Sequence, residues 1–353
     1  MIRIRNAVYK NIFSAQTLRP AGIRSLPLLR SGLALLWIVV AWLLLAEIVA
    51  RTALGYSLPP PSVGADSFEF DIKVYYLEQS IRQRGRLDCL IVGDSMTNTG
   101  PDPKLIEAAY LAQTGSSLHC FNFGMPALML DASGPLAAAL VNRFQPRLLI
   151  LFLSGRDFDS SFGVTFRHVA DSDWTEQNLG RGSLRGWAVN SLYAYRYSLF
   201  LQYWLNPSNR AGFAEAQKAI TLQGLSPLYG YGESPDITGD SPRFQIADPA
   251  AQKGFDQFLQ LKRAGVNLLV VDAPIRPDYY TAYRVEFYEP YIEDMQNILG
   301  PRGIPFWLTG ELSESIAAED WYDWQHVNDK GIPVLSAWLG EQLAQYYPPA
   351  FFE

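Results

Sequence analysis

Short apolar runs recur along the chain, each bounded by polar or turn-forming residues. They predict strands at residues 87–93, 117–123, 148–153, 266–272 and 304–308. Uninterrupted apolar runs of this kind are typical of parallel strands that are covered on both faces. The third run, Leu-Leu-Ile-Leu-Phe-Leu, is the clearest. The pattern therefore predicts a parallel sheet of about five strands.

Helical patterns lie between these runs. We expect helices at residues 67–86, 129–143, 249–264, 283–299 and 332–346, with a further helix that begins near 101–103 and ends at Gly115. Pro101 and Pro103 suit a helix start. Strands that alternate with helices at this spacing predict an α/β fold with right-handed crossovers. The expected architecture is a three-layer, doubly wound parallel sheet.

A segment at about 158–248 breaks this rhythm and is expected to be a mostly helical insertion after the third strand. Insertions of this length in compact domains often form lids or binding loops. The segment is rich in aromatic residues: Trp187, Tyr193, Tyr195, Tyr197, Phe200, Tyr203 and Trp204. We expect most of them to form a local helical core, with a few lining an acyl or sugar pocket.

Residues 31–50 are almost entirely apolar, and about 20 such residues suffice to cross a bilayer as a helix. Basic residues precede them, which predicts a cytoplasmic segment at 1–30, a transmembrane anchor at 31–50 and an extracytoplasmic body. A cleaved signal peptide and a buried core helix are the alternatives. The long leading segment and the poor cleavage site favour the anchor. Glu47 is expected at the membrane interface.

Between the anchor and the body, residues 51–86 are expected to form a spacer and a lead-in helix. The stretch Leu-Pro-Pro-Pro-Ser at 58–62 is polyproline-like and predicts a stiff spacer that lifts the domain at 87–353 off the membrane.

The charge of the chain is distributed unevenly. The 353 residues carry a net charge of −6, but seven of the 29 basic residues and one of the 35 acidic residues lie within 1–51. The remainder therefore has a net charge of −12. An acidic body argues against nucleic acid as a partner. Two cysteines and three histidines without paired spacing predict no metal site, and no motif predicts a cofactor.

Cys89 and Cys120 each lie four residues before a glycine, Gly93 or Gly124, that ends a predicted strand. If the two strands are neighbours, the thiols lie at similar heights. A disulfide would suit an oxidising compartment, but geometry across adjacent strands is often strained. We expect two buried thiols.

The sequence Gly-Asp-Ser at 93–95 ends the first predicted strand. A serine at this point lies at the carboxyl edge of the sheet, where α/β folds hold their ligands. Ser95 is therefore a candidate nucleophile, and a helix N-cap is the alternative, which would be favoured if no distant base were present. A serine hydroxyl needs a base.

Asp323 and His326 supply a candidate base more than two hundred residues later. An aspartate three residues before a histidine can orient and charge-stabilise the imidazole. The alternative for Asp323 is the N-cap of a short turn. His119, in a predicted strand, and His168, in the insertion, are expected to be structural.

Together, the Gly-Asp-Ser and Asp-x-x-His stretches resemble the SGNH (GDSL-like) family of serine hydrolases and acyltransferases. The likeness spans residues 87–335, except for the insertion, and implies a flavodoxin-like sheet. It also implies that Ser95 is the nucleophile, His326 the general base and Asp323 the residue that holds the imidazole.

The resemblance further implies an oxyanion hole. Its donors would be the N–H of Ser95, the N–H of Gly124 in Asn-Phe-Gly, and a third group at the position where the family has Asn and this chain has Asp157. An ionised carboxylate cannot donate a hydrogen bond. Three explanations stay open: Asp157 is protonated, Arg156 takes over as donor, or Asp157 pairs with Arg156 or with a substrate group.

The layout resembles membrane-anchored members that work with membrane-bound O-acyltransferases on cell-surface polymers, as in alginate acetylation and teichoic-acid D-alanylation. We therefore expect a serine esterase or O-acyltransferase that acts on acyl esters or acylated glycans. The rival is a non-catalytic module that binds glycan or assembles a complex, which Asp157 favours. Arg276, after the fourth strand, is expected to pair with a nearby acid rather than bind an anionic substrate.

Overall fold

A five-stranded, all-parallel sheet forms the centre of the body, with the order β2-β1-β3-β4-β5. Its strands are β1 (Cys89–Gly93), β2 (Cys120–Gly124), β3 (Leu148–Leu153), β4 (Asn267–Asp272) and β5 (Phe306–Trp307). The computed structural model describes residues 26–52, 58–158, 166–231 and 248–353. The prediction of an α/β fold with five parallel strands is confirmed, although β5 is shorter than expected.

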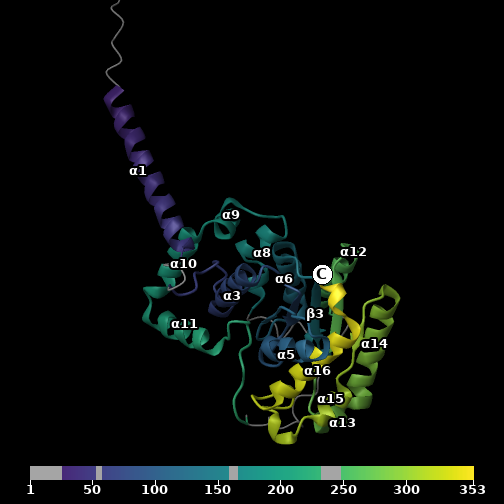
Figure 1. Cartoon of the computed structure of the whole chain (residues 1–353). Coiled ribbons are helices and arrows are strands. Elements are labelled where there is room, and N and C mark those ends of the chain that lie inside the picture. The colour runs from purple at the N-terminus through teal and green to yellow at the C-terminus, as the bar shows by residue number, and fades with distance from the viewer. Residues whose placement is uncertain (1–25, 53–57, 159–165, 232–247) are drawn as a thin grey trace, which may run out of the picture.

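Helices cover both faces of the sheet (Figure 1). Because neighbouring side chains on a strand point to opposite faces, Leu90 and Val92 of β1 join one apolar core while Cys89 and Ile91 join the other. The first core is completed by helices that include α3 (Phe68–Arg84), α6 (Leu130–Phe144), α12 (Pro249–Arg263) and α14 (Glu289–Leu299). The second is completed by α5 (Pro103–Thr114) and α16 (Gly331–Tyr346).

The remaining elements are short, apart from those of the insertion. They are α4 (Ser95–Thr99), α13 (Pro277–Tyr283), a π-helical turn (Arg284–Tyr288), α15 (Gly310–Ser315) and the 3-10 turns Gly155–Phe158, Gly300–Arg302, Ala318–Asp320 and Pro349–Phe351. Because α13, the π-helical turn and α14 are continuous, the helical region before β5 begins earlier than the predicted residue 283.

The insertion is helical where the structure describes it, as predicted. It contains α7 (Arg167–Ala170), α8 (Asp173–Asn178), α9 (Leu184–Ser191), α10 (Tyr193–Trp204) and α11 (Pro207–Ala219). Phe200 packs edge-on against Phe213 and tilts against Trp204, with ring centroids 5.0 and 5.3 Å away. Tyr193 and Phe200 belong to the first apolar core of the body and Tyr195 and Tyr197 pack against it, so these residues join the main core instead of forming a local one; Trp187 and Trp204 are exposed. The parts of the insertion at 159–165 and 232–247 lie outside the described residues.

Helix α1 (Leu26–Arg51) is long and apolar enough to span a membrane between Gly32 and Arg51. It projects from the body in Figure 1 and meets it beside α10. The Glu47 carboxylate accepts hydrogen bonds from the backbone amides of Tyr193 and Ala194, at 3.0 and 2.8 Å. The only acid of the predicted anchor therefore caps a helix of the body. Most of the predicted cytoplasmic segment, residues 1–25, lies outside the described residues.

The predicted spacer is wrong for residues 60–63, because Pro60, Pro61, Ser62 and Val63 are buried against the body. The backbone amide of Val63 donates a 2.7 Å hydrogen bond to the buried Asp71 carboxyl of α3. Desolvation raises the pKa of Asp71 to about 7, against the lowering effect of its hydrogen bonds with Ser62 and Val63. The proline run therefore packs as part of the domain.

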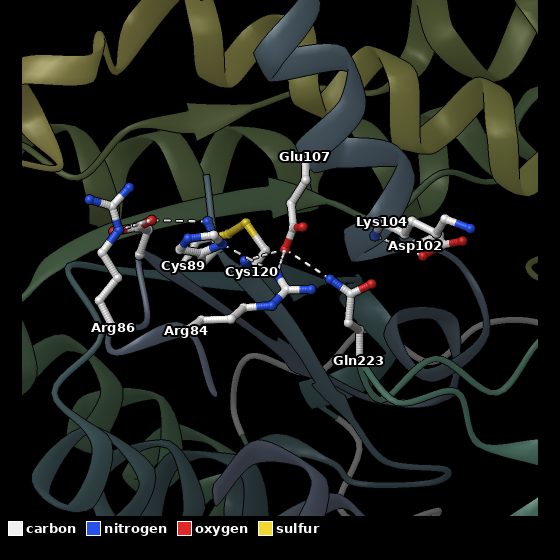
Figure 2. Close-up of a disulfide and its surroundings, with 10 residues drawn as sticks. Arg84, Arg86, Cys89, Asp102, Lys104, Glu107, Cys120 and Gln223 are labelled. Atoms are coloured by element: carbon white, nitrogen blue, oxygen red, sulfur yellow. Dashed lines mark hydrogen bonds and ion pairs between the residues drawn. A yellow bond between two sulfur atoms is a disulfide. The ribbon is translucent and has the colours of Figure 1, made fainter. Parts of the chain in front are cut away.

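Cys89 and Cys120 form a disulfide, so the expectation of two buried thiols is wrong. The parallel register places the two residues directly opposite one another, with Cα atoms 4.5 Å apart, which lies within the range that a disulfide can bridge. In Figure 2, Glu107 lies beside the bond and accepts from the Cys120 amide, from Arg84 and from Gln223. The acid holds α5, α3 and the insertion around the covalent link.

Replacing both cysteines (Cys89→Ala with Cys120→Ala) should lower the free energy of unfolding by about 3–4 kcal/mol, because the bond closes a long loop in the unfolded chain. The measurement is denaturant unfolding of the full chain in detergent. Wild-type protein reduced before unfolding is the matched control, since it keeps both sulfur atoms. Two alkylatable thiols in protein denatured without reductant would contradict the disulfide.

Candidate active site

The turn after β1 brings Ser95 to the carboxyl edge of the sheet. Gly93 has a φ of 153°, and a Cβ at that position would collide with the side chain of Thr97 and the carbonyl of Phe152, so only glycine fits. Asp94 then caps α4 by accepting a 2.9 Å hydrogen bond from the Met96 amide. Ser95 is the first residue of α4, and Asp94 rather than Ser95 is the N-cap.

The structure brings Ser95, His326 and Asp323 together. Ser95 Oγ lies 2.8 Å from His326 Nε2, and His326 Nδ1 lies 2.8 Å from Asp323 Oδ2. With Nδ1 protonated and donating to the carboxylate, Nε2 is free to accept the serine proton. This is the proton-transfer arrangement that an activated serine requires.

Asp323 has a second role within its own loop. Its Oδ1 accepts hydrogen bonds from the backbone amides of Gln325 and His326, both at 2.8 Å. Burial alone would raise the pKa of Asp323, but the hydrogen bond and charge of His326, together with these amides, hold it below its usual value. The carboxylate thus stays ionised and fixes both the turn and the imidazole, so the two roles predicted for Asp323 coexist.

The loop that carries the histidine is held by its neighbours. Trp324 stacks on Tyr279 of α13 with ring centroids 4.2 Å apart, and its carbonyl accepts from the Arg276 amide. Asn328 donates through its side chain to the carbonyls of Glu319 and Gly230. These contacts fix the imidazole position from two sides of the loop.

The predicted backbone donors differ in availability. The Ser95 amide is at the first position of α4, where a helix offers no intrahelical acceptor to the backbone N–H. The Gly124 amide is already used, because it donates to Asn122 Oδ1 at 2.8 Å. Gly124 is required for a different reason: a Cβ there would collide with the backbone of Thr97 and Asn98, since α4 packs directly on β2.

Asp157 lies in the 3-10 turn after β3 and is almost fully buried. Its Oδ2 accepts from the Ser154 amide at 2.7 Å, while its Oδ1 is buried and has no hydrogen-bond partner. Burial, reinforced by the nearby charge of Asp94, raises the pKa of Asp157 well above the usual range. A raised pKa means that Asp157 keeps its proton to higher pH than an ordinary aspartate does, and a protonated carboxyl group can donate a hydrogen bond.

Arg156 points toward the histidine loop. It donates to the side chain of Gln325 at 3.2 Å, and its guanidinium lies 5.5 Å from the ring centre of Trp324. The structure therefore places Arg156 beside the loop that carries Asp323 and His326.

Sequence reasoning missed Lys73 of α3, which is fully buried behind the turn. Its Nζ donates to the side chain of Asn98 on α4 and to the carbonyl of Gly124 on β2. Burial lowers the pKa of Lys73 to about 8, and the negative charge of Glu69 opposes that effect. The same helix also carries Glu69 and Asp71, so nothing in the sequence distinguished Lys73 from an ordinary charged helix residue.

Asn122 was noted only as part of a motif, but its side chain braces the turn. Its Nδ2 donates to the carbonyls of Thr97 and Pro101, at 2.6 and 2.8 Å, and its Oδ1 accepts from Gly124. The residue therefore ties β2 to both ends of the segment that follows Ser95.

The remaining polar residues considered in the sequence, His119, His168 and Arg276, make contacts away from Ser95. His119 precedes β2 instead of lying within it, and its Nδ1 is 3.3 Å from Arg84. His168 stacks on Phe166. Arg276 pairs with Asp278 at 2.7 Å, as expected. Within the described residues, no group of acidic, histidine or cysteine side chains could hold a metal ion.

The raised pKa of Asp157 has a measurable effect on stability. Between the usual aspartate pKa of 3.8 and the raised pKa of the folded protein, Asp157 is ionised in the unfolded chain and protonated in the folded one, which favours unfolding. Asp157→Asn should therefore stabilise the protein near pH 7 and lose this advantage near pH 4, with a slope of up to about 1.4 kcal/mol per pH unit.

Denaturant unfolding of the full chain in detergent at several pH values measures this difference. Asp256→Asn, at an exposed position on α12, is the control for removing one carboxylate. A stability difference for Asp157→Asn that is the same at pH 4 and pH 7 would show that Asp157 is ionised in the folded protein.

No family model and no curated protein matches the chain. Among solved structures, the chain is similar to one described as a gut microbial diltiazem-metabolizing enzyme, with 11% identity and a TM-score of 0.27. The likeness covers 73% of this chain and 47% of that one, so this chain spans about half the length of that protein. A likeness of this strength carries no argument about fold or activity.

Proposed function

We propose that this protein is an SGNH-like serine esterase or O-acyltransferase that works through a Ser95 acyl-enzyme. The observation that carries the proposal is the hydrogen-bonded chain Ser95–His326–Asp323, which joins residues 231 positions apart. The sheet order β2-β1-β3-β4-β5 supports it, since flavodoxin-like doubly wound sheets have this order.

In the proposed mechanism, His326 Nε2 takes the hydroxyl proton as Ser95 Oγ attacks the ester carbonyl. The imidazolium then protonates the departing alcohol, and an acyl-serine ester remains. Water or an acceptor hydroxyl next loses a proton to His326 and attacks that ester. The imidazolium then returns the proton to Ser95 Oγ as the acyl–serine bond breaks, which regenerates the free serine. Asp323 stabilises the imidazolium in both halves and stays ionised throughout.

The oxyanion of each tetrahedral intermediate needs donors. We propose the open amide of Ser95 and the neutral carboxyl group of Asp157, whose Oδ1 is buried and unpaired. Loss of one such donor typically slows acyl transfer by about 10²–10³-fold. In this proposal, protonation compensates for the aspartate at the position where the family has asparagine.

Membrane attachment completes the proposal. Helix α1 would span the bilayer with its N-terminus in the cytoplasm, and the body would act outside on ester-linked acyl groups of a cell-surface glycan or polymer. The Cys89–Cys120 disulfide supports this location, because such bonds persist in oxidising compartments. A membrane-bound O-acyltransferase is the partner that the layout suggests.

The rival is a non-catalytic module that binds glycan or assembles a complex. The occupied Gly124 amide favours it, because a hydrolase of this type would use that donor. The two proposals differ in one property, the nucleophilicity of Ser95.

A fluorophosphonate probe should label Ser95 in the full chain in detergent, as mapped by peptide mass spectrometry. Because His326 removes the serine proton, His326→Ala should slow labelling by about 10⁶-fold. Ser95→Ala should abolish it. His119→Ala is the matched control, since that histidine lies apart from Ser95. A folded protein that stays unlabelled would support the non-catalytic module and refute the acyl-enzyme.

The rate of labelling should fall at alkaline pH, because the Asp157 proton is lost as pH rises through its raised pKa and the resulting carboxylate repels the oxyanion. In Asp157→Asn, the side-chain amide can donate a hydrogen bond at every pH, so its labelling rate should not fall at alkaline pH. The measurement is the pH dependence of the labelling rate for both proteins. An identical alkaline loss in both would exclude Asp157 as the donor.

A further inference from the structure

The end of α1 is fixed to the body by a specific set of contacts. Glu47 accepts from the first two amides of α10, whose own N-cap residue, Leu192, provides no side-chain cap. Arg51 pairs with Glu47 and also donates to the Ser191 carbonyl. The surface around Tyr193 therefore has a defined position relative to the end of the apolar helix.

A hollow of about 540 Å³ opens beside this junction. Arginines from three separate elements line it: Arg51 of α1, Arg82 of α3 and Arg143 of α6. Its other polar lining residues are Glu78, Asn190, Ser191 and Tyr193. Arg51 and Arg143 keep 49% and 39% of their side-chain surface exposed, so both guanidinium groups are accessible to a ligand.

The hollow has an excess of positive charge. Glu78 is bound by the buried Arg196 through two hydrogen bonds of 2.6 and 3.0 Å, and by the Tyr193 hydroxyl at 2.7 Å. Glu47 is satisfied by Arg51 and the α10 amides. Three arginines (Arg51, Arg82 and Arg143) and one carboxylate (Glu78) line the hollow, so its lining carries a net charge of +2.

Apolar side chains are exposed at the same end of the body. Leu184 and Trp187, one turn apart on α9, are 82% and 50% exposed. Figure 1 shows α9 and α10 beside the foot of α1, at the end of the body from which that helix projects. Exposed leucine and tryptophan next to arginine are typical of surfaces that lie at a membrane interface.

We propose that this hollow binds the phosphate of an anionic phospholipid from the bilayer that α1 crosses. Arginine groups bind phosphate oxygens with charge-assisted hydrogen bonds, and a surplus of two charges favours a headgroup with net negative charge. Leu184 and Trp187 would enter the interface beside it. The inference rests on the membrane-spanning role of α1 and is independent of the chemistry at Ser95.

Native mass spectrometry of the full chain in detergent tests the proposal, with phosphatidylglycerol and phosphatidylcholine titrated separately. Phosphatidylglycerol should bind more tightly. Arg82→Gln with Arg143→Gln should weaken its binding by about fivefold for each arginine removed. Arg263→Gln with Arg302→Gln removes the same charge from exposed positions at the end of α12 and in the 3-10 turn that follows α14, and should leave binding unchanged.

Other outcomes would overturn the lipid site. Equal affinity for the two lipids, or equal weakening by both pairs of substitutions, would show that the hollow does not select an anionic lipid. Displacement of the lipid by glycerol 3-phosphate or inorganic phosphate at similar concentration would assign the site to a soluble anion.

The anchor and the fold are checked separately. Retention of the protein in membranes after carbonate extraction tests α1. Unchanged thermal unfolding and unchanged Ser95 labelling verify the fold of the Arg82→Gln, Arg143→Gln protein. A failure of the lipid site therefore cannot be confused with a failure of the anchor or of the serine chemistry.

Discussion

The parallel pairing of β1 with β2 determines most of what surrounds Ser95. It places Gly93 opposite Gly124 and Cys89 opposite Cys120, so the turn before the serine and the disulfide lie at the two ends of the same strand pair. Because α4 packs on Gly124 without room for a side chain, the position of Ser95 is fixed by backbone contact. The loop that carries His326 then meets Ser95 at the carboxyl edge of the sheet.

Much of this arrangement could be predicted because it is encoded locally. Uninterrupted apolar runs marked β1, β3 and β4 to within two residues, and Pro103 with Gly115 marked the two ends of α5. The spacing between Asp323 and His326 predicted their contact, since three residues on one turn bring carboxylate and imidazole within hydrogen-bond distance. Their meeting with Ser95 followed from the carboxyl-edge rule for parallel sheets.

What could not be predicted depends on contacts between distant segments. In the sequence, Lys73 looks like an ordinary helix residue. In the fold, its ammonium group lies between α4 and β2 and donates hydrogen bonds to both. From the sequence, Glu47 is expected to be an acid at the membrane interface, whereas in the fold its carboxylate accepts hydrogen bonds from the first two amides of α10. The sequence also could not show whether the Gly124 amide is open to a ligand. That amide donates to the Asn122 side chain, and the bond depends on the rotamer of Asn122, which sequence spacing does not determine.

The disulfide has a consequence for the integrity of the serine turn. Cys89 and Cys120 close a covalent ring that contains Ser95, α4 and α5. A protease that cuts one peptide bond inside this ring opens it but releases no fragment, because the sulfur bridge still joins the two pieces. Nicked protein would therefore migrate as a single species until it is reduced. In an environment rich in proteases, the segment that carries the serine is retained even after its backbone is broken.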